Sequence, residues 1–181
     1  MKDMREDIDH ILFTEEQLHA RVRELGAEIT EKYADKNPLI VGILRGCFVF
    51  MSDLVREIKT PCMVDFMAVS SYEGSVSKGS VKIKKDMSED VLDRHVIIVE
   101  DILDTGTTLY NLKNLLMTRS PASLAIATLL DKPSRRTADI EADFVGYQVP
   151  NEFVVGYGLD YNEEYRNLPY IGVLKPEIYT K

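Results

Sequence analysis

The sequence holds 181 residues, of which 45% are hydrophobic and 29% are charged, and this balance is typical of one soluble globular domain spanning residues 1–181. The formal net charge of −8 argues against a broad nucleic-acid footprint and against binding to an anionic membrane. Two cysteines are too few for a disulfide framework, and no apolar run approaches the roughly 20 residues that span a bilayer. We therefore expect a cytoplasmic protein without a membrane partner.

The first predicted element is an amphipathic helix that begins after Thr14. Thr14 and Gln17 have the spacing of a capping box. Apolar residues then recur every three or four positions and form one face: Leu18, Val22, Leu25, Ile29 and Tyr33. Pro38 follows the end of this pattern. We assign the helix to core packing and to no chemistry.

An apolar run at residues 39–44 predicts a buried strand. A short turn with Arg45, Gly46 and Cys47 follows it, and apolar spacing then predicts a helix from Phe48. The turn amides and the arginine would suit a pyrophosphate group. Taken alone, however, the segment is more typical of an ordinary strand-to-helix turn with an exposed arginine.

A loosely alternating run at residues 62–70 predicts a further strand, and residues 81–84 alternate as the strand that returns. The ten residues between them, 71–80, contain two glycines, four serines and one lysine. This composition predicts a mobile segment, which is either a plain hairpin loop or a lid that closes over a site and excludes water.

The most informative stretch joins a strand to a helix at residues 96–109. Residues 96–99 are apolar and β-branched, which predicts a buried parallel strand that ends at Glu100 and Asp101. A small polar run follows, made of Asp104, Thr105, Gly106, Thr107 and Thr108. Three leucines then recur at helical spacing, at Leu109, Leu112 and Leu116.

This pattern suits a phosphorylated ligand. Small residues let backbone N–H groups approach a phosphate, and the N-terminus of a helix adds partial positive charge. Glu100 and Asp101 would repel that phosphate unless ribose hydroxyls or a hydrated Mg²⁺ lay between them. The alternative is a solvated strand end with a threonine-rich helix cap. The agreement of strand, acids and turn favours the binding site.

A further buried strand is predicted at residues 123–130, and it ends at a basic cluster that contains Lys132, Arg135 and Arg136. A solvated loop is the usual meaning of such a cluster. In an α/β sheet, however, ligands bind at the carboxyl ends of the strands, so the cluster is also a candidate site.

Short strands are expected at residues 143–147 and 153–158, with a closing strand at residues 171–174. Phe153 would serve either as a core residue or as a platform on which a purine stacks. The intervening segment, residues 159–170, is acidic and carries interleaved tyrosines. Read alone, it is typical of a surface loop.

Residues 96–109 resemble the motif with which type I phosphoribosyltransferases bind 5-phosphoribosyl-1-pyrophosphate (PRPP). Residues 154–163 and Arg166 closely resemble the terminal segment of the hypoxanthine-guanine phosphoribosyltransferases of that family. The resemblance extends over about residues 14–174, which is nearly the whole chain. It implies an α/β fold with a largely parallel twisted sheet flanked by helices and a small hood subdomain. We expect the core at about residues 38–136 and the hood at about residues 1–13 and 137–181.

The activity that the resemblance implies is transfer of the phosphoribosyl group from PRPP to N9 of hypoxanthine or guanine. The products would be IMP or GMP and pyrophosphate, and the cofactor would be Mg²⁺. Relatives of this kind are dimers or tetramers, so we expect a homo-oligomer, with a tetramer favoured and no stable nucleic-acid partner.

The resemblance also implies roles for individual residues. The 5′-phosphate would be held by Asp104, Thr105, Gly106, Thr107 and Thr108, with Asp104 also the general base near purine N7. The pyrophosphate would be held by Leu44, Arg45, Gly46 and Arg166, in a loop where the family often has a cis peptide bond before the basic residue. Ser71 and Tyr72 resemble the start of the family's flexible catalytic loop.

The purine and the metal complete these implied roles. Lys132 would donate to the 6-oxygen of the purine, Phe153 would stack on its face, and the Val154 backbone with Asp160 would read its far edge. A donor at position 6 favours 6-oxopurines over adenine, whose amino group is itself a donor. Metal would be held by Asp160 directly, and by Glu100 and Asp101 beside the ribose hydroxyls.

Two alternatives stay open. One is a relative that prefers another base, above all xanthine, which differs by a single carbonyl at position 2. The other is an RNA-binding regulator of the same fold, which would use a basic face. The net charge of −8 and the presence of Asp104 argue against the regulator, although Lys132, Arg135 and Arg136 form a local basic patch.

Overall fold

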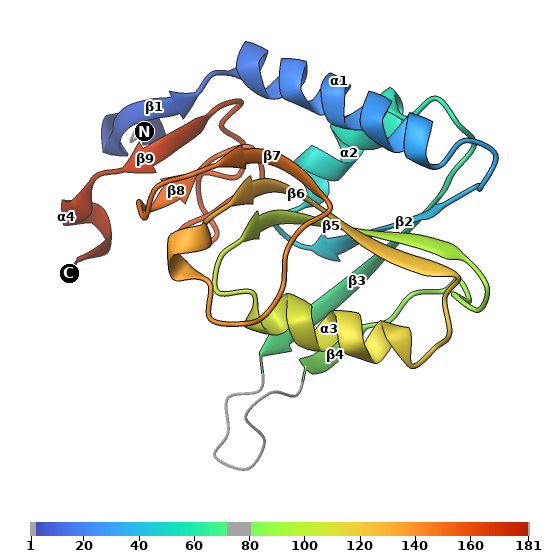
Figure 1. The fold of residues 1–181 in the computed structure, drawn as a ribbon. Coiled ribbons are helices and arrows are strands. Elements are labelled where there is room, and N and C mark those ends of the chain that lie inside the picture. Colours follow the sequence, from blue (N-terminus) through green and yellow to red (C-terminus); the bar gives the residue numbers. More distant parts are fainter. Residues whose placement is uncertain (1–2, 72–80, 181) are drawn as a thin grey trace.

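The computed structural model describes residues 3–71 and 81–180, and Figure 1 shows their arrangement. The helices are α1 (Glu15–Lys32), α2 (Phe48–Glu57), α3 (Thr107–Met117) and α4 (Pro176–Tyr179), with 3-10 turns η1 (Met4–Asp7) and η2 (Pro133–Arg135). The strands are β1 (Ile8–Phe13), β2 (Leu39–Leu44), β3 (Met63–Ser71), β4 (Val81–Lys85), β5 (His95–Leu103), β6 (Ser123–Asp131), β7 (Phe144–Gln148), β8 (Val154–Val155) and β9 (Ile171–Leu174). No helix in the described part of the chain combines the length and the apolar character that crossing a membrane requires.

The larger of the two described sheets has the strand order β4-β3-β2-β5-β6-β7. All neighbours in it pair parallel except the edge strand β4, which pairs antiparallel with β3. Helices cover both faces, with α1 and α2 on one side and α3 on the other (Figure 1). The predicted α/β fold with a largely parallel sheet is therefore confirmed.

The central strands read as continuous apolar runs because both of their faces are buried. Ile97 packs into the cluster beneath α1 and α2, whereas its neighbour Ile98 packs into the cluster beneath α3. Both side chains are fully buried. This alternation fixes the register of β5, because a slip by one residue would exchange the two faces.

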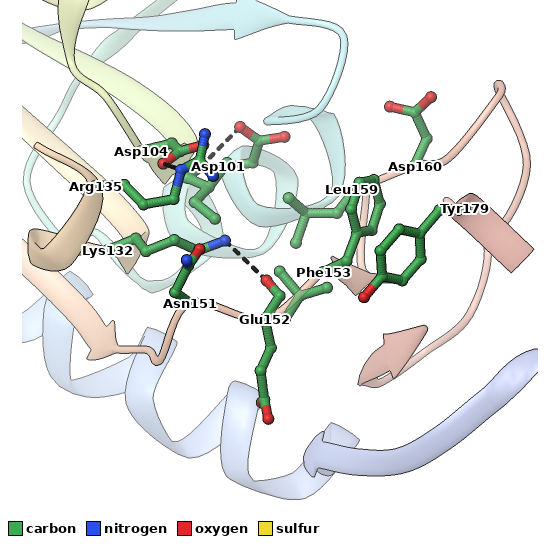
Figure 2. A pocket seen from close by; sticks show the side chains of 12 residues that line it. Asp101, Asp104, Lys132, Arg135, Asn151, Glu152, Phe153, Leu159, Asp160 and Tyr179 are labelled. Atoms are coloured by element: carbon green, nitrogen blue, oxygen red, sulfur yellow. Dashed lines mark hydrogen bonds and ion pairs between the residues drawn. The ribbon is translucent and has the colours of Figure 1, made fainter. Parts of the chain in front are cut away.

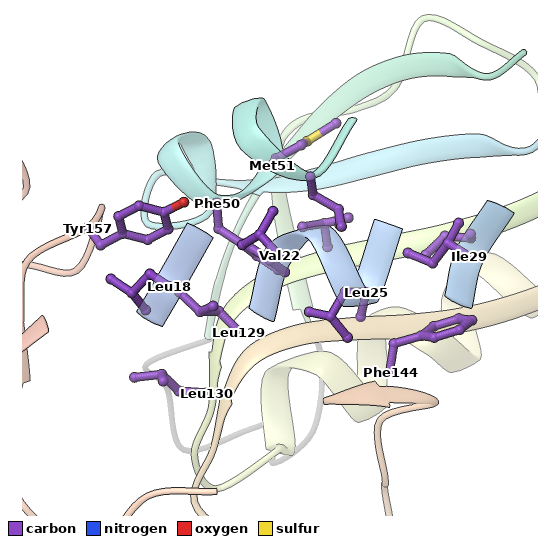
Figure 3. Close-up of a cluster of buried hydrophobic side chains, with 14 of the residues drawn as sticks. Leu18, Val22, Leu25, Ile29, Phe50, Met51, Leu129, Leu130, Phe144 and Tyr157 are labelled. Carbon is purple, nitrogen blue, oxygen red and sulfur yellow. The ribbon is translucent and has the colours of Figure 1, made fainter. Parts of the chain in front are cut away.

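Helix α1 forms as predicted. Thr14 Oγ1 accepts from the Gln17 N–H, and the Gln17 side chain accepts from the Thr14 N–H, which completes the capping box. The five apolar positions of its predicted face are all buried. Figure 3 shows part of this face, including Leu18 and Leu25, packed against α2 and strand β6.

A smaller antiparallel sheet, with the order β1-β9-β8, joins the two ends of the chain. We refer to this small sheet as the hood, because its strands come from the two segments predicted for a hood, about residues 1–13 and 137–181. Strand β7, at Phe144–Gln148, pairs parallel with β6 and so extends the large sheet. Strand β7 therefore lies in the large sheet, although its residues fall within the range 137–181. Helix α1 likewise packs on the core, outside the range 38–136.

Candidate active site

The carboxyl ends of β2, β5 and β6 meet at one edge of the large sheet, because these strands run parallel. Each strand is followed there by residues that the sequence singled out: the loop at residues 44–47, the acidic turn at residues 100–108, and Lys132. In a sheet of this kind the crevice outside the strand ends is the usual place for a ligand.

The turn after β5 is shaped for close approach by a ligand. Gly106 is the N-cap of α3 and has a φ of +78°, a conformation that favours glycine. A Cβ added there would lie 2.6 Å from Ile140 Cγ2. A hollow of about 130 Å³ lies beside the turn, lined by residues that include Asp104, Thr105, Gly106 and Thr108. The N-terminus of an eleven-residue helix thus opens onto a small cavity, which suits a phosphate.

Arg136 stabilises this turn through hydrogen bonds to its backbone. Its Nη1 donates to the Leu103 carbonyl at 2.9 Å and also to the Asp104 carbonyl, while Nη2 pairs with the Asp131 carboxylate. The side chain is largely buried. Arg136 therefore holds the backbone of the phosphate turn, and it does not belong to a solvated basic patch.

Glu100 and Asp101, the acidic pair, lie in β5 shortly before its end at Leu103, and both are partly buried. Burial, reinforced by the neighbouring Asp101 charge, raises the pKa of Glu100 well above its usual value. Burial likewise raises the pKa of Asp101 to about 6, although its Oδ1 accepts from the Ile102 N–H at 2.7 Å. Among the described residues, Glu100 Oε2 has no hydrogen-bond partner. The charge of Arg166 favours the ionised form of Asp101 but does not offset the effect of burial.

The donor set fits a hard divalent cation. Carboxylate oxygens are the ligands that Mg²⁺ prefers, and a cation between Glu100 and Asp101 would relieve their repulsion. In the ranges 3–71 and 81–180, however, no three His, Cys, Asp or Glu side chains form a group that could hold a metal ion. Oxygens of a substrate would have to complete the coordination.

The raised pKa of Asp101 predicts that the free energy of unfolding of the metal-free protein depends on pH. An Asp pKa of about 6, against an ordinary 3.8, means that the folded state keeps its proton where the unfolded chain has lost it. Through this group the free energy of unfolding is highest below about pH 4 and falls as pH rises to about 6. Asp101→Asn removes this cost. We expect melting curves recorded with a chelator to show the variant gaining stability relative to wild type between pH 4 and pH 7. A difference in melting temperature that stays constant over this range would contradict the argument.

The loop after β2 packs tightly between two other segments. The Leu44–Arg45 peptide bond is cis. A Cβ on Gly46 would lie 1.5 Å from Asp101 Oδ2, and a Cβ on Gly158 would lie 2.2 Å from the Gly46 carbonyl oxygen. The loop therefore needs glycine at both contacts in order to sit against the acidic pair.

Two arginines converge beside this loop. Glu163 Oε2 lies 3.0 Å from Arg45 Nη1 and 3.2 Å from Arg166 Nη2. Arg166 Nη2 also lies 2.9 Å from Asp160 Oδ1, and its Nη1 donates to the Gly158 carbonyl at 2.8 Å. A carboxylate thus lies between the two cations, at a place where an anionic ligand of higher charge would compete with it.

The largest part of the site is a pocket of about 440 Å³ that shares Ile102 and Asp104 with the phosphate hollow. Its lining includes Asp101, Asp104, Lys132, Arg135, Phe153, Val154, Leu159, Asp160 and Tyr179, most of which are labelled in Figure 2. Lys132 Nζ donates to the Glu152 carbonyl at 2.9 Å, and burial lowers the pKa of this lysine. Asp104 Oδ1 lies 2.8 Å from Arg135 Nε. The pocket therefore presents a donor and an acceptor beside an aromatic ring.

The structure brings together most of the residues that the sequence singled out. The residues that were predicted to bind the purine line one pocket with Asp101 and Asp104: Lys132, Phe153, Val154 and Asp160. Ser71 ends β3, where its backbone pairs with Val81. Tyr72 lies outside the described residues.

Four residues of the site were not assigned roles from the sequence: Arg135, Arg136, Glu163 and Tyr179. Each contacts a residue that was assigned one, through an ion pair, a backbone hydrogen bond or a ring contact. The only sequence signals for them are the basic cluster after β6 and the tyrosine-rich character of the C-terminal segments.

Fold and site together define a type I phosphoribosyltransferase, and the family model described as "Phosphoribosyl transferase domain" matches residues 12–162. The chain is 55% identical over 177 residues to the hypoxanthine-guanine phosphoribosyltransferase of Bacillus subtilis, which covers 97% of this chain and 98% of that relative. The chain belongs to the hypoxanthine-guanine phosphoribosyltransferase family.

Two further comparisons agree with this assignment. A crystal structure of a hypoxanthine phosphoribosyltransferase from Staphylococcus aureus superposes with a TM-score of 0.95 at 54% identity, covering 98% of this chain and 97% of that one. The chain is also 53% identical over 181 residues to the bifunctional protein TilS/HprT of Listeria monocytogenes. It matches 28% of the length of that longer relative.

Proposed function

We propose that this protein transfers the phosphoribosyl group of PRPP to N9 of hypoxanthine or guanine, forming IMP or GMP and releasing pyrophosphate. One observation carries the proposal: Asp104, Lys132 and Phe153 line a single pocket that adjoins the phosphate hollow. The names of the relatives from Bacillus subtilis and Staphylococcus aureus support the same activity.

PRPP would bind along the strand ends. The turn from Asp104 to Thr108 holds the 5′-phosphate with backbone amides and threonine hydroxyls. The pyrophosphate lies at the loop of Leu44, Arg45 and Gly46 and displaces Glu163 from Arg45 and Arg166. Arg45 and Glu163 are exposed, so loss of their ion pair costs no more than about 1 kcal/mol, whereas Arg166 is largely buried.

Mg²⁺ is the proposed cofactor. When bound, it would neutralise pyrophosphate charge as that group departs. Asp160 is the proposed direct ligand, while Glu100 and Asp101 would hold the ribose hydroxyls and a second ion. The raised pKa of both carboxylates supports this role, because a bound cation would favour their ionised forms beyond what Arg166 does for Asp101.

The purine would stack on Phe153 with its 6-oxygen toward Lys132 Nζ. Its far edge would face the Val154 backbone and Asp160. As N9 bonds to C1′ of the ribose, the bond from C1′ to pyrophosphate breaks, and Asp104 takes the proton from N7. Arg135 must leave Asp104 for this transfer. Because about half of the Arg135 side chain is exposed, the purine can displace it at small cost.

Lys132 provides a test of base selection. We expect Lys132→Gln to lower kcat/KM for hypoxanthine by about 10- to 100-fold, because a charged hydrogen bond to the 6-oxygen is replaced by a weaker neutral one. Activity with adenine should fall less or rise, since an amide can also accept from an amino group. The matched control is Lys175→Gln, whose Nζ donates to the Glu6 carbonyl in the hood. Equal losses for both bases would contradict the assigned role of Lys132.

The proposed reaction is tested by pyrophosphate release from PRPP with hypoxanthine, guanine, xanthine or adenine supplied separately. Turnover with hypoxanthine and guanine that stops when Mg²⁺ is chelated would support it. Turnover with xanthine alone would contradict the proposal that the base pocket selects hypoxanthine and guanine. Folded protein that turns over no base would favour the RNA-binding regulator.

The assembly and location of the protein are part of the same proposal. We propose a homo-oligomer, a tetramer or else a dimer, working in the cytoplasm with no nucleic-acid partner. Sedimentation equilibrium at several protein concentrations measures the assembly directly, and a monomer at all of them would contradict it.

A further inference from the structure

Phe153 carries an aromatic neighbour that the proposed reaction does not use. The ring of Tyr179 stacks on it, with centroids 4.9 Å apart and an angle of 23° between the planes. The ring of Tyr161 meets Phe153 almost perpendicularly, at 89° and 5.5 Å. Both geometries are favourable for aromatic pairs. Phe153 nevertheless stays 37% exposed, so part of its surface is open to a ligand.

Backbone hydrogen bonds and packing hold helix α4 beside Phe153, where its Tyr179 ring can stack. Strand β9 ends beside Phe153, where the Leu174 N–H donates to the Phe153 carbonyl at 2.8 Å. The Lys175 N–H then donates to the Asp7 carbonyl at 2.9 Å, and α4 follows at once. Ile178 and Tyr179 pack against the buried hood cluster that contains Leu174. Tyr179 is therefore held by the hood and is not a loose terminal side chain.

An aromatic ring has two faces, and a stacked neighbour takes one of them. Figure 2 places Tyr179 on the side of Phe153 away from Lys132 and Asp104. A purine that reaches both of these residues must use the opposite face. Tyr179 would then back the ring on which the purine stacks.

We propose that Tyr179 is a positioning residue for the purine, and that its ring holds Phe153 flat against a 6-oxopurine in the pocket. The inference rests on the proposed function, because it concerns the same base pocket. The stacked ring restricts rotation of the partly exposed Phe153 side chain, so less conformational freedom is lost when the purine binds. The C-terminal helix thereby takes part in base recognition without contacting the base.

A Tyr179 ring that blocked the pocket would have the opposite effect on purine affinity. If the Tyr179 ring occupied the place of the purine in the free protein, binding would have to expel it. Removing the ring would then strengthen purine binding. The sign of the effect therefore separates a ring that supports Phe153 from a ring that blocks the pocket.

The test measures GMP affinity by titration calorimetry and KM for hypoxanthine in the full-length protein. We expect Tyr179→Ala and Tyr179→Leu to weaken GMP binding and raise KM by about two- to ten-fold, the value of one aromatic pair. The KM for PRPP should stay within about two-fold. Tyr179→Phe keeps the ring and should behave as wild type, as should Glu177→Ala on the exposed side of the same helix.

The decisive comparison measures the effect of Tyr179→Ala in a protein that already carries Phe153→Ala. If Tyr179 acts through Phe153, then Tyr179→Ala should change GMP affinity no further once Phe153 is removed. An equal loss in both backgrounds, unchanged affinity in Tyr179→Ala, or tighter binding would each overturn the inference. GMP binding by a wild-type protein without turnover would count against the proposed transfer alone. Absence of GMP binding by wild type would overturn both.

Discussion

Asp104→Asn is expected to lower kcat with hypoxanthine by about 10²- to 10⁴-fold, the usual contribution of a general base. Asparagine keeps the shape of the side chain but cannot take the N7 proton. The KM for PRPP should change little, because the phosphate turn uses backbone amides and threonine hydroxyls. Steady-state kinetics with each substrate varied in turn measure both quantities.

Asp139→Asn is the matched control for this variant. Asp139 is exposed and lies outside the lining of the base pocket. It should keep wild-type kinetics. If Asp104→Asn kept more than about a tenth of wild-type kcat, the N7 proton would have to leave by another route.

Gly46→Ala is expected to lower kcat/KM for PRPP by about 100-fold. The added methyl group would lie 1.5 Å from Asp101 Oδ2, so either the loop or the acidic pair must shift. Asp101 Oδ1 accepts from the Ile102 N–H, which restrains this side chain, so we expect the loop to move. A displacement of about 1 Å at a reacting group can cost this factor in rate.

The control for Gly46→Ala is Ser52→Ala, an exposed position on the helix that follows the same loop. Circular dichroism should show that both variants are folded, with a modest decrease in melting temperature for Gly46→Ala alone. A Gly46→Ala protein with the wild-type KM for PRPP and wild-type kcat would show that this loop is not the pyrophosphate site.

The elements of the large sheet were predictable because their signals are local. The apolar face of α1 and the buried runs of β2, β5 and β6 follow from spacing within each segment. Strand β7 was assigned to the hood because its residues show that a strand is present but not which sheet it joins. Its parallel pairing with β6 depends on a crossover of 12 residues that carries no pairing signal.

The pairs that complete the site depend on contacts across the chain. Arg135 lies opposite Asp104, and Glu163 lies between Arg45 and Arg166, because parallel strands bring separate loops to one edge. No periodicity in the sequence encodes such a meeting. The family resemblance supplied candidate roles for residues on its motifs, but it gave no partners for them.

Tyr179 illustrates the same limit. It is 26 positions from Phe153, and the stacking depends on the antiparallel pairing of β8 with β9. A tyrosine near the end of the chain is unremarkable as a sequence feature. Only the hood geometry places it against the ring of the base pocket.

The most direct test of the account is a crystal structure with PRPP, Mg²⁺ and 9-deazahypoxanthine, in which carbon replaces N9 so that the bond to C1′ does not form. We expect the purine to stack on Phe153, its 6-oxygen to lie within hydrogen-bond distance of Lys132 Nζ, and its N7–H to donate to Asp104. The pyrophosphate should lie beside Arg45 and Arg166. A purine bound outside this pocket, or one whose N7 faces away from Asp104, would contradict the account.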